Sequence, residues 1–313
     1  MMREFLLNSI NTSPDVIVIS SSRGGFISSN IFPGKKISNN FLRGASLEDY
    51  LALYDIVESK KWKPAKIVFT LDPWLLNDNN EAVRWMMLEK NYNSMLKKLN
   101  ITNTPAISKT APTNSLEFEK ALQLVSFSYF KQAYIYLRKN KRAFYPTDNR
   151  CNEGLTYLAD GSMCYDKQRR KNSIKAVDKL AVNYIQDEPV YCLGRFSKLS
   201  AAKIVLLEKL VDHIKSQGIE VEFYLPPYHP MVYDYLTKTP KYKEVFAAEA
   251  YYVDLAKRKN LVYCGSFNPA AYGLNKSWFY DGMHAKEKAV ELIFKSTAIK
   301  EAHLINSTNK EKI

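Results

Sequence analysis

The sequence has few residues that bind metals tightly, with four cysteines and four histidines among 313 residues. The cysteines show no C-x-x-C spacing and no histidine partner nearby, which argues against a structural zinc site. Each histidine is isolated and no carboxylate cluster accompanies it, which argues against a metallohydrolase. We therefore predict no metal and no cofactor. Free thiols are expected, with a Cys151–Cys164 disulfide as the alternative if the chain is exported.

Long hydrophobic runs are also missing. No window of about 18 apolar residues occurs, so no membrane-spanning helix is predicted. Residues 1–10 are too short and too polar for the apolar region of a signal peptide. We expect a soluble chain, although a chain separated from a membrane anchor would show the same pattern.

Acidic residues are outnumbered, with 32 Asp and Glu against 45 Lys and Arg and a formal net charge of +13. Such a charge attracts phosphates, anionic lipid surfaces and acidic glycans, and its sign does not choose among them. The basic clusters at 60–61, 167–175 and 238–243 are loose, which is typical of solvated faces. Nucleic-acid binding is therefore an unlikely alternative that depends on charge alone.

The pattern of apolar segments predicts an α/β fold. A hydrophobic content of 46% in a chain of this length supports a sizeable core. Strands are expected at 15–20, 65–71, 221–225 and 261–264, and helices at 46–60, 200–217, 241–259 and 286–296. This alternation predicts a three-layer α/β/α sandwich around a parallel sheet of about five strands. Residues 39–45 are expected to form a loop.

The middle of the chain is less regular. Residues 100–195 are predicted to form a largely helical insertion within a single domain that spans residues 1–313. A helix is expected at 81–99, just before it, and a second at 115–139, within it. Turn formers and charged residues follow at 143–187, with a hairpin-type turn at 157–162.

Polar residues with chemical potential follow the predicted strands. Asp281 and His284 lie three residues apart on a glycine-containing turn, where the carboxylate can orient the imidazole. Ser22 follows the first strand and can supply a nucleophilic hydroxyl, although turn serines more often bond the local backbone. Gly44 lets its backbone N–H approach a developing oxyanion, and Asp72 follows another strand.

This ordered set resembles the SGNH, or GDSL-like, hydrolase and acyltransferase superfamily over nearly the whole chain outside the insertion. The family's nucleophile block, a strand followed by Gly-Asp-Ser or Gly-Ser-Ser, corresponds to residues 20–22 and implies Ser22 as the nucleophile. Its glycine block corresponds to Gly44, whose N–H would join that of Ser22 in the oxyanion hole. Its Asp-x-x-His block matches residues 281–284, with His284 as general base and Asp281 as its orienting carboxylate. The resemblance also implies a flavodoxin-like arrangement of the sheet.

Residues 22–23, 71–74, 160–162 and 279–282 are similar to the branch of this superfamily that is associated with bacterial cell-envelope polysaccharides. The resemblance implies a serine esterase or O-acyltransferase acting on a carbohydrate ester, carrying an acetyl or other acyl group. The substrate would be a carbohydrate or polysaccharide, including anionic ones. A membrane acyl donor would be the partner if the enzyme transfers the acyl group. The expected location is the bacterial cytoplasm or the cell envelope.

The chain departs from the family at the Gly-x-Asn block, which reads Thr70-Leu71-Asp72. An ionised carboxylate cannot donate to an oxyanion as the family's Asn does, and losing such a donor costs about 10²–10³ in rate in other enzymes. Arg23 is predicted to replace that donor or to clamp an anionic sugar, with a salt bridge to Asp72 as the alternative. Trp74 and His229 are the other predicted substrate contacts. For His229, a loop residue held by backbone hydrogen bonds is the alternative.

This departure leaves a second function open. In that interpretation the chain is a catalytically impaired SGNH-like domain that binds an anionic glycan through its positive charge.

Overall fold

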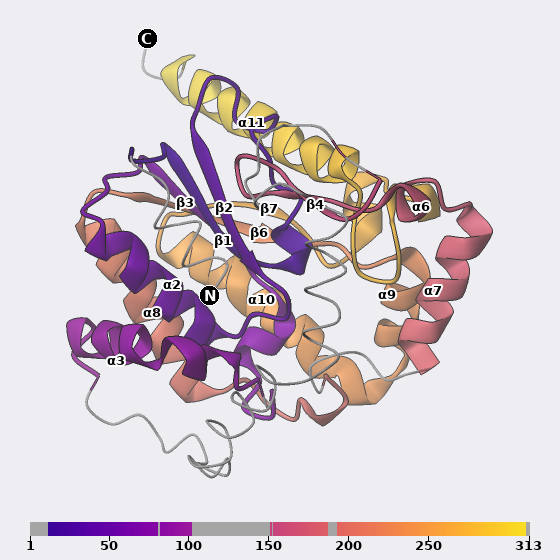
Figure 1. The fold of residues 1–313 in the computed structure, drawn as a ribbon, viewed down its shortest axis with the longest axis horizontal. Helices are drawn as coiled ribbons and strands as arrows, with labels where there is room; N and C mark the ends of the chain where they lie inside the picture. Colours follow the sequence, from indigo (N-terminus) through magenta and orange to yellow (C-terminus); the bar gives the residue numbers. More distant parts are fainter. Residues whose placement is uncertain (1–11, 81, 102–150, 152, 187–192, 311–313) are drawn as a thin grey trace, which may run out of the picture.

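The computed structural model describes residues 12–80, 82–101, 151, 153–186 and 193–310 (Figure 1). Its centre is a five-stranded parallel sheet with strand order β2-β1-β3-β6-β7. The strands are β1 (Val16–Ser21), β2 (Ile37–Leu42), β3 (Lys66–Thr70), β6 (Glu220–Leu225) and β7 (Val262–Gly265). Because all five run in the same direction, their carboxyl ends meet at one edge of the sheet, where α/β proteins place their sites.

Helices cover both faces of the sheet, which confirms the predicted three-layer α/β architecture. In Figure 1, α2 (Leu47–Ser59), α8 (Ala201–Ser216) and α10 (Lys243–Arg258) lie below the sheet and α11 (Glu287–Lys310) lies above it. Alternate strand side chains point to opposite faces, so β1 sends Ile17 into one core and Val18 into the other. Both faces are therefore apolar, and the strands read as continuous hydrophobic runs.

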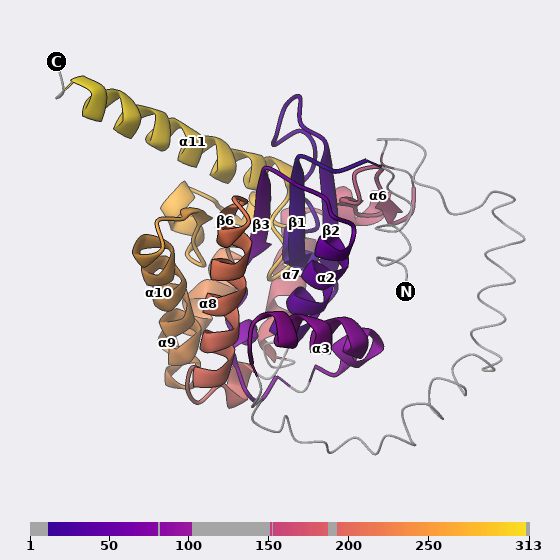
Figure 2. The ribbon, with the colours of Figure 1, turned by 90° about the vertical axis from the view of Figure 1, so that its left-hand side faces the viewer.

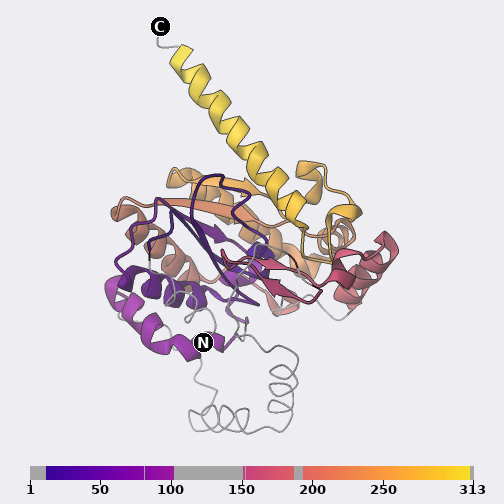
Figure 3. The ribbon, with the colours of Figure 1, turned by 45° about the horizontal axis from the view of Figure 1, so that its top comes forward.

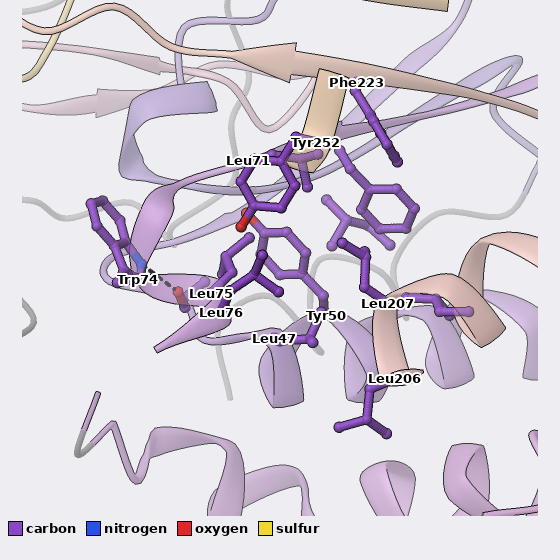
Figure 4. Close-up of a cluster of buried hydrophobic side chains, with 14 of the residues drawn as sticks. Leu47, Tyr50, Leu71, Trp74, Leu75, Leu76, Leu206, Leu207, Phe223 and Tyr252 are labelled. Carbon is purple, nitrogen blue, oxygen red and sulfur yellow. Dashed lines mark hydrogen bonds between the residues drawn. The ribbon is translucent and has the colours of Figure 1, made fainter. Parts of the chain in front are cut away.

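The larger core also fixes the loops at the carboxyl edge (Figure 4). The Tyr50 hydroxyl donates to the Thr70 carbonyl at 2.7 Å, and the Trp74 indole N–H donates to the Ala45 carbonyl at 3.0 Å. Both side chains are fully buried. Each of these aromatic residues contributes apolar area to the core and uses its polar tip to hold a strand end or a loop.

The edge strand β2 covers residues 39–42 of the loop that the sequence predicts at 39–45, and only the rest is a turn. It was missed because Ser38, Asn39 and Asn40 are polar although all three are buried. The Asn39 amide donates to the carbonyls of Gly24 and Ile27, at 2.9 and 2.8 Å. These bonds satisfy the amide in the protein interior, so the usual apolar signal of a buried strand is not needed here.

Several helices differ from the prediction. The helix expected at 81–99 is a 3-10 turn (Arg84–Leu88) followed by α3 (Glu89–Lys98). A helix that was not expected, α9 (Pro230–Lys238), begins with a proline, which is favoured in the first helical turn. The helix predicted at 115–139 lies outside the described residues.

The described part of the insertion is compact. It contains the hairpin of β4 (Thr156–Tyr157) and β5 (Met163–Cys164), the short helix α6 (Lys167–Arg170) and the helix α7 (Ile174–Gln186). The hairpin turn agrees with the prediction at 157–162. The helix α7 is not predicted, because charged residues and turn formers surround it in the sequence. The structure describes only part of the predicted insertion at 100–195, mainly residues 153–186.

Cys151 and Cys164 form a disulfide, so the expectation of free thiols is wrong for this pair. Cys264 is a buried free cysteine, and Cys192 lies outside the described residues. No helix in the described ranges is both long enough and apolar enough to cross a membrane. Figures 2 and 3 show that the C-terminal part of α11 extends well beyond the sheet that its first turns cover.

Candidate active site

Ser22 stands at the carboxyl end of β1, where the strand turns sharply into a 3-10 turn (Ser22–Gly24). The turn is closed by the backbone N–H of Arg23, which donates to Ser21 Oγ at 3.1 Å. Gly24 is required here because a Cβ at this position would lie 2.2 Å from Thr70 Oγ1. Ser21 and Arg23 are buried, but Ser22 between them is partly exposed. The turn therefore presents the Ser22 hydroxyl at the edge of the sheet.

The turn after β7 brings a histidine and a carboxylate to the same edge. His284 Nε2 lies 3.0 Å from Ser22 Oγ, and His284 Nδ1 lies 2.9 Å from Asp281 Oδ1. The turn is closed by the backbone N–H of Tyr280, which donates to the His284 carbonyl at 2.9 Å. The three side chains predicted from the sequence thus form one hydrogen-bonded series, in the geometry of a nucleophile, a base and an orienting acid.

The Asp281 carboxylate is held in its ionised form. Burial raises its pKa, but the charge of His284 and the hydrogen bond from it outweigh burial, so the pKa lies well below the usual value of an aspartate. Oδ1 also accepts the backbone N–H groups of Met283 and His284, at 3.0 and 2.9 Å. An ionised carboxylate at this position stabilises the imidazolium that forms when His284 accepts a proton.

Gly44 lies in the turn that follows β2, next to the 3-10 turn that carries Ser22. The parallel register pairs Ser21 with Leu42, so the residues that follow each strand emerge side by side. Gly44 has a φ of 62°, a left-handed conformation that favours glycine. The backbone N–H of Ala45 closes this turn on the Leu42 carbonyl at 3.2 Å. The two predicted backbone donors, on Ser22 and Gly44, therefore belong to adjacent turns.

Asp72 is fully buried and paired with Arg23. Arg23 Nη1 donates to Asp72 Oδ1 at 2.9 Å, and both side chains are closed to solvent. Burial raises the pKa of Asp72, and the guanidinium opposes that rise. A protonated Asp72 would leave a buried guanidinium without a counterion, so we assign the ionised form. The salt bridge is the alternative that the structure bears out, and Asp72 does not serve as an oxyanion donor.

Arg23 joins several segments at the edge of the sheet. Its Nε donates to the Met283 carbonyl at 3.0 Å, and its Nη2 donates to the Pro226 carbonyl at 2.6 Å. The ring of Tyr228 stacks on the guanidinium, 4.0 Å from its central carbon. Arg23 is only 2% exposed, so the prediction that it contacts substrate is corrected: its side chain holds the turn at residues 280–284 in place.

Trp74 and His229 are also fully buried, which corrects their predicted contact with substrate. His229 caps α9, with Nδ1 accepting the backbone N–H of Met231 at 3.3 Å, and burial lowers the pKa of its imidazole. Its own backbone N–H donates to the Gly282 carbonyl at 3.1 Å. Both residues therefore support the candidate site from behind, Trp74 through the Gly44 turn and His229 through the turn at residues 280–284.

The insertion contributes residues that were not predicted. We call residues 156–170, which include the β4–β5 hairpin and α6, the arm. The backbone N–H of Met163 donates to the Gly25 carbonyl at 2.7 Å, and the ring of Tyr165 packs edge-on to His284 with centroids 5.9 Å apart. Arg169 Nη2 donates to Asp281 Oδ2 at 2.8 Å. The sequence predicts the hairpin turn of the arm, but for Arg169 its signal is the basic cluster at 167–175, which is typical of a solvated face.

Within the described ranges, no group of three or more His, Cys, Asp or Glu side chains is arranged to hold a metal ion. Comparison with known proteins adds no relative: no family model matches the chain, and no curated protein matches it. The case for a function therefore depends on the arrangement of Ser22, His284 and Asp281.

Proposed function

We propose that the chain is an SGNH-like serine esterase or O-acyltransferase that acts on a carbohydrate ester. The supporting observation is the hydrogen-bonded series from Ser22 Oγ to His284 Nε2 at 3.0 Å and from His284 Nδ1 to Asp281 Oδ1 at 2.9 Å. A serine, a neutral imidazole and an ionised carboxylate in this order constitute an activated nucleophile.

In the first half-reaction His284 Nε2 removes the proton of Ser22 Oγ as that oxygen attacks the acyl carbonyl. Asp281 stabilises the resulting imidazolium, and the N–H groups of Ser22 and Gly44 stabilise the tetrahedral oxyanion. The carbon–oxygen bond to the sugar then breaks, and His284 returns the proton to the departing sugar hydroxyl. The acyl group remains on Ser22.

In the second half-reaction His284 removes a proton from the incoming acceptor as that acceptor attacks the acyl carbon. The bond from this carbon to Ser22 Oγ then breaks, and His284 returns the proton to Oγ. Water as acceptor gives a free acid and makes the chain an esterase. A sugar hydroxyl as acceptor gives a new ester and makes it an acyltransferase. Which acceptor prevails depends on how well the site excludes water.

Two further observations agree with a role at the cell envelope. The Cys151–Cys164 disulfide is of a kind that persists mainly in oxidising compartments such as the bacterial periplasm. The formal net charge of +13 favours encounter with an anionic polysaccharide. We propose such a polysaccharide as the natural substrate class.

The decisive test combines p-nitrophenyl acetate turnover with fluorophosphonate labelling of the purified chain. We expect Ser22→Ala to lower kcat/KM by at least about 10³-fold and to abolish labelling, because the nucleophile is lost. Ser28→Ala, a partly exposed serine in the following loop, is the matched control and should retain both. Equal turnover by wild type and Ser22→Ala would remove Ser22 from the mechanism.

The engagement of Asp72 by Arg23 favours one alternative, a catalytically impaired domain that binds an anionic glycan. Without a third donor at position 72, turnover would be slower by about 10²–10³-fold, and glycan binding would be the main activity. Failure of the wild type to label while it still binds an anionic polysaccharide would select this function.

A further inference from the structure

We propose that Arg169 is a positioning residue of this site, which fixes the Asp281 carboxylate against His284 and places a positive charge beside the pair. This inference rests on the proposed function for its kinetic consequence. Its structural basis is a direct contact: Arg169 Nη2 donates to Asp281 Oδ2 at 2.8 Å.

The two oxygens of Asp281 face different partners. Oδ1 accepts the backbone N–H groups of Met283 and His284, which come from the same turn. Oδ2 is reached by Arg169, which lies 112 positions earlier in the chain. Since both oxygens lie about equally close to His284 Nδ1, at 2.9 and 3.0 Å, the contact at Oδ2 helps to fix the plane of the carboxylate relative to the imidazole.

The arm places Arg169 before any substrate arrives. Asp166 caps α6, and its Oδ1 accepts the backbone N–H of Arg169 at 2.8 Å. The guanidinium carbon lies 4.3 Å from the centre of the Tyr165 ring, whose edge contacts His284. Tyr165 directly follows Cys164, which is tied by the disulfide. The backbone of Arg169 is thus held by Asp166 and its side chain by Asp281 and Tyr165, while the side chain remains 35% exposed.

A cation at Oδ2 has an electrostatic effect as well as a geometric one. Arg169 contributes to lowering the pKa of Asp281, so the carboxylate stays ionised throughout the acidic range. The same positive charge opposes the formation of an imidazolium on the other side of the carboxylate. Removing the charge of Arg169 should therefore make the imidazole of His284 easier to protonate.

Other charged and titratable side chains surround the turn at residues 280–284 without contacting the Asp281 carboxylate. They come from the β1, β3 and β6 ends, the arm, α7 and the start of α11, and include Arg23, Asp72, His229, Tyr165, Arg170, Tyr184, Lys286 and Glu287. The two that form the buried ion pair balance each other, and burial raises the pKa of both tyrosines so that they stay neutral. Among these described side chains only Arg169 is a cation in contact with Asp281.

The experiment measures the pH profile of kcat/KM for p-nitrophenyl acetate and, separately, the NMR titration of the His284 ring proton. We expect Arg169→Gln to move the acid limb and the imidazole midpoint to higher pH and to lower the plateau of kcat with little change in KM. Arg169→Lys, which keeps the charge, should restore the midpoint. Lys171→Ala removes a positive charge from an exposed position just beyond the arm and should leave both curves unchanged.

An unchanged imidazole midpoint in folded Arg169→Gln would overturn the inference, as would an equal shift in Lys171→Ala. If the wild type turns over no ester, the proposed function fails, and the NMR titration still decides the role of Arg169. If Arg169→Gln does not fold, Arg169→Met replaces it in the same titration, since it keeps the length of the stem and removes the charge.

Discussion

At the scale of single residues, the pairing of Arg23 with Asp72 gives the acid at position 72 a structural role as a counterion. An acid in place of the family's Asn indicates a lost oxyanion donor, whereas the structure uses that carboxylate as the counterion of a guanidinium that holds the Met283 carbonyl. The acid was visible in the sequence, and so were both roles for Arg23. What decided between them was burial, because a cation closed to solvent requires a counterion.

We therefore expect Asp72→Asn to destabilise the protein and not to improve catalysis. Breaking one side of a buried ion pair costs about 3–5 kcal/mol, since the remaining charge is left uncompensated. Urea unfolding of the variant and the wild type measures this loss. The double variant Arg23→Met with Asp72→Leu should lose less stability than the sum of the two single changes. Unchanged stability with faster turnover would show that the amide reaches the oxyanion.

At the scale of elements, the arm is the segment whose role the sequence did not disclose. Its strands are two residues each, too short for periodicity to mark them, and its contacts with the site cross more than a hundred positions. By contrast, β1 and β3 were predicted because both of their faces are buried, which produces continuous apolar runs. The edge strand β2 was missed for the opposite reason, since its buried face is built from hydrogen-bonded amides.

The disulfide at the base of the arm gives a test at this scale. We expect Cys151→Ser to lower the free energy of unfolding by about 3 kcal/mol, because the bond closes a loop with a sequence separation of 13. Turnover should fall as well, since Tyr165 directly follows Cys164 and Arg169 lies in the short helix after it. Thermal melting with and without a reductant is the measurement. Reductant should lower the Tm of the wild type and of Cys264→Ala but not that of Cys151→Ser, and a wild type indifferent to reductant would contradict this.

At the scale of the whole molecule, the net charge of +13 acts on charged substrates and not on neutral ones. We expect kcat/KM for an anionic polysaccharide ester to fall as salt rises, because the Debye length shrinks from about 10 Å at 0.1 M. The value for p-nitrophenyl acetate measured in parallel should stay constant. A polysaccharide rate that does not respond to salt would place recognition in short-range contacts.

The whole fold also explains which parts of the site could be predicted. Asp281 and His284 were found together because they share one turn, and Ser22 was found because it ends a recognisable strand. The sequence predicts substrate contact for Arg23, Trp74 and His229, whereas the structure buries all three behind the site. A sequence does not report which polar side chains are closed to solvent.

The contacts of Arg23 with distant segments affect how the newly made chain folds. The guanidinium donates to the carbonyls of Pro226 and Met283, and Ser22 contacts His284, which lies 262 positions later in the chain. During synthesis Arg23 is made 203 positions before Pro226 and 260 positions before Met283. The guanidinium therefore lacks one or both carbonyl partners until both later segments have left the ribosome and folded onto the sheet.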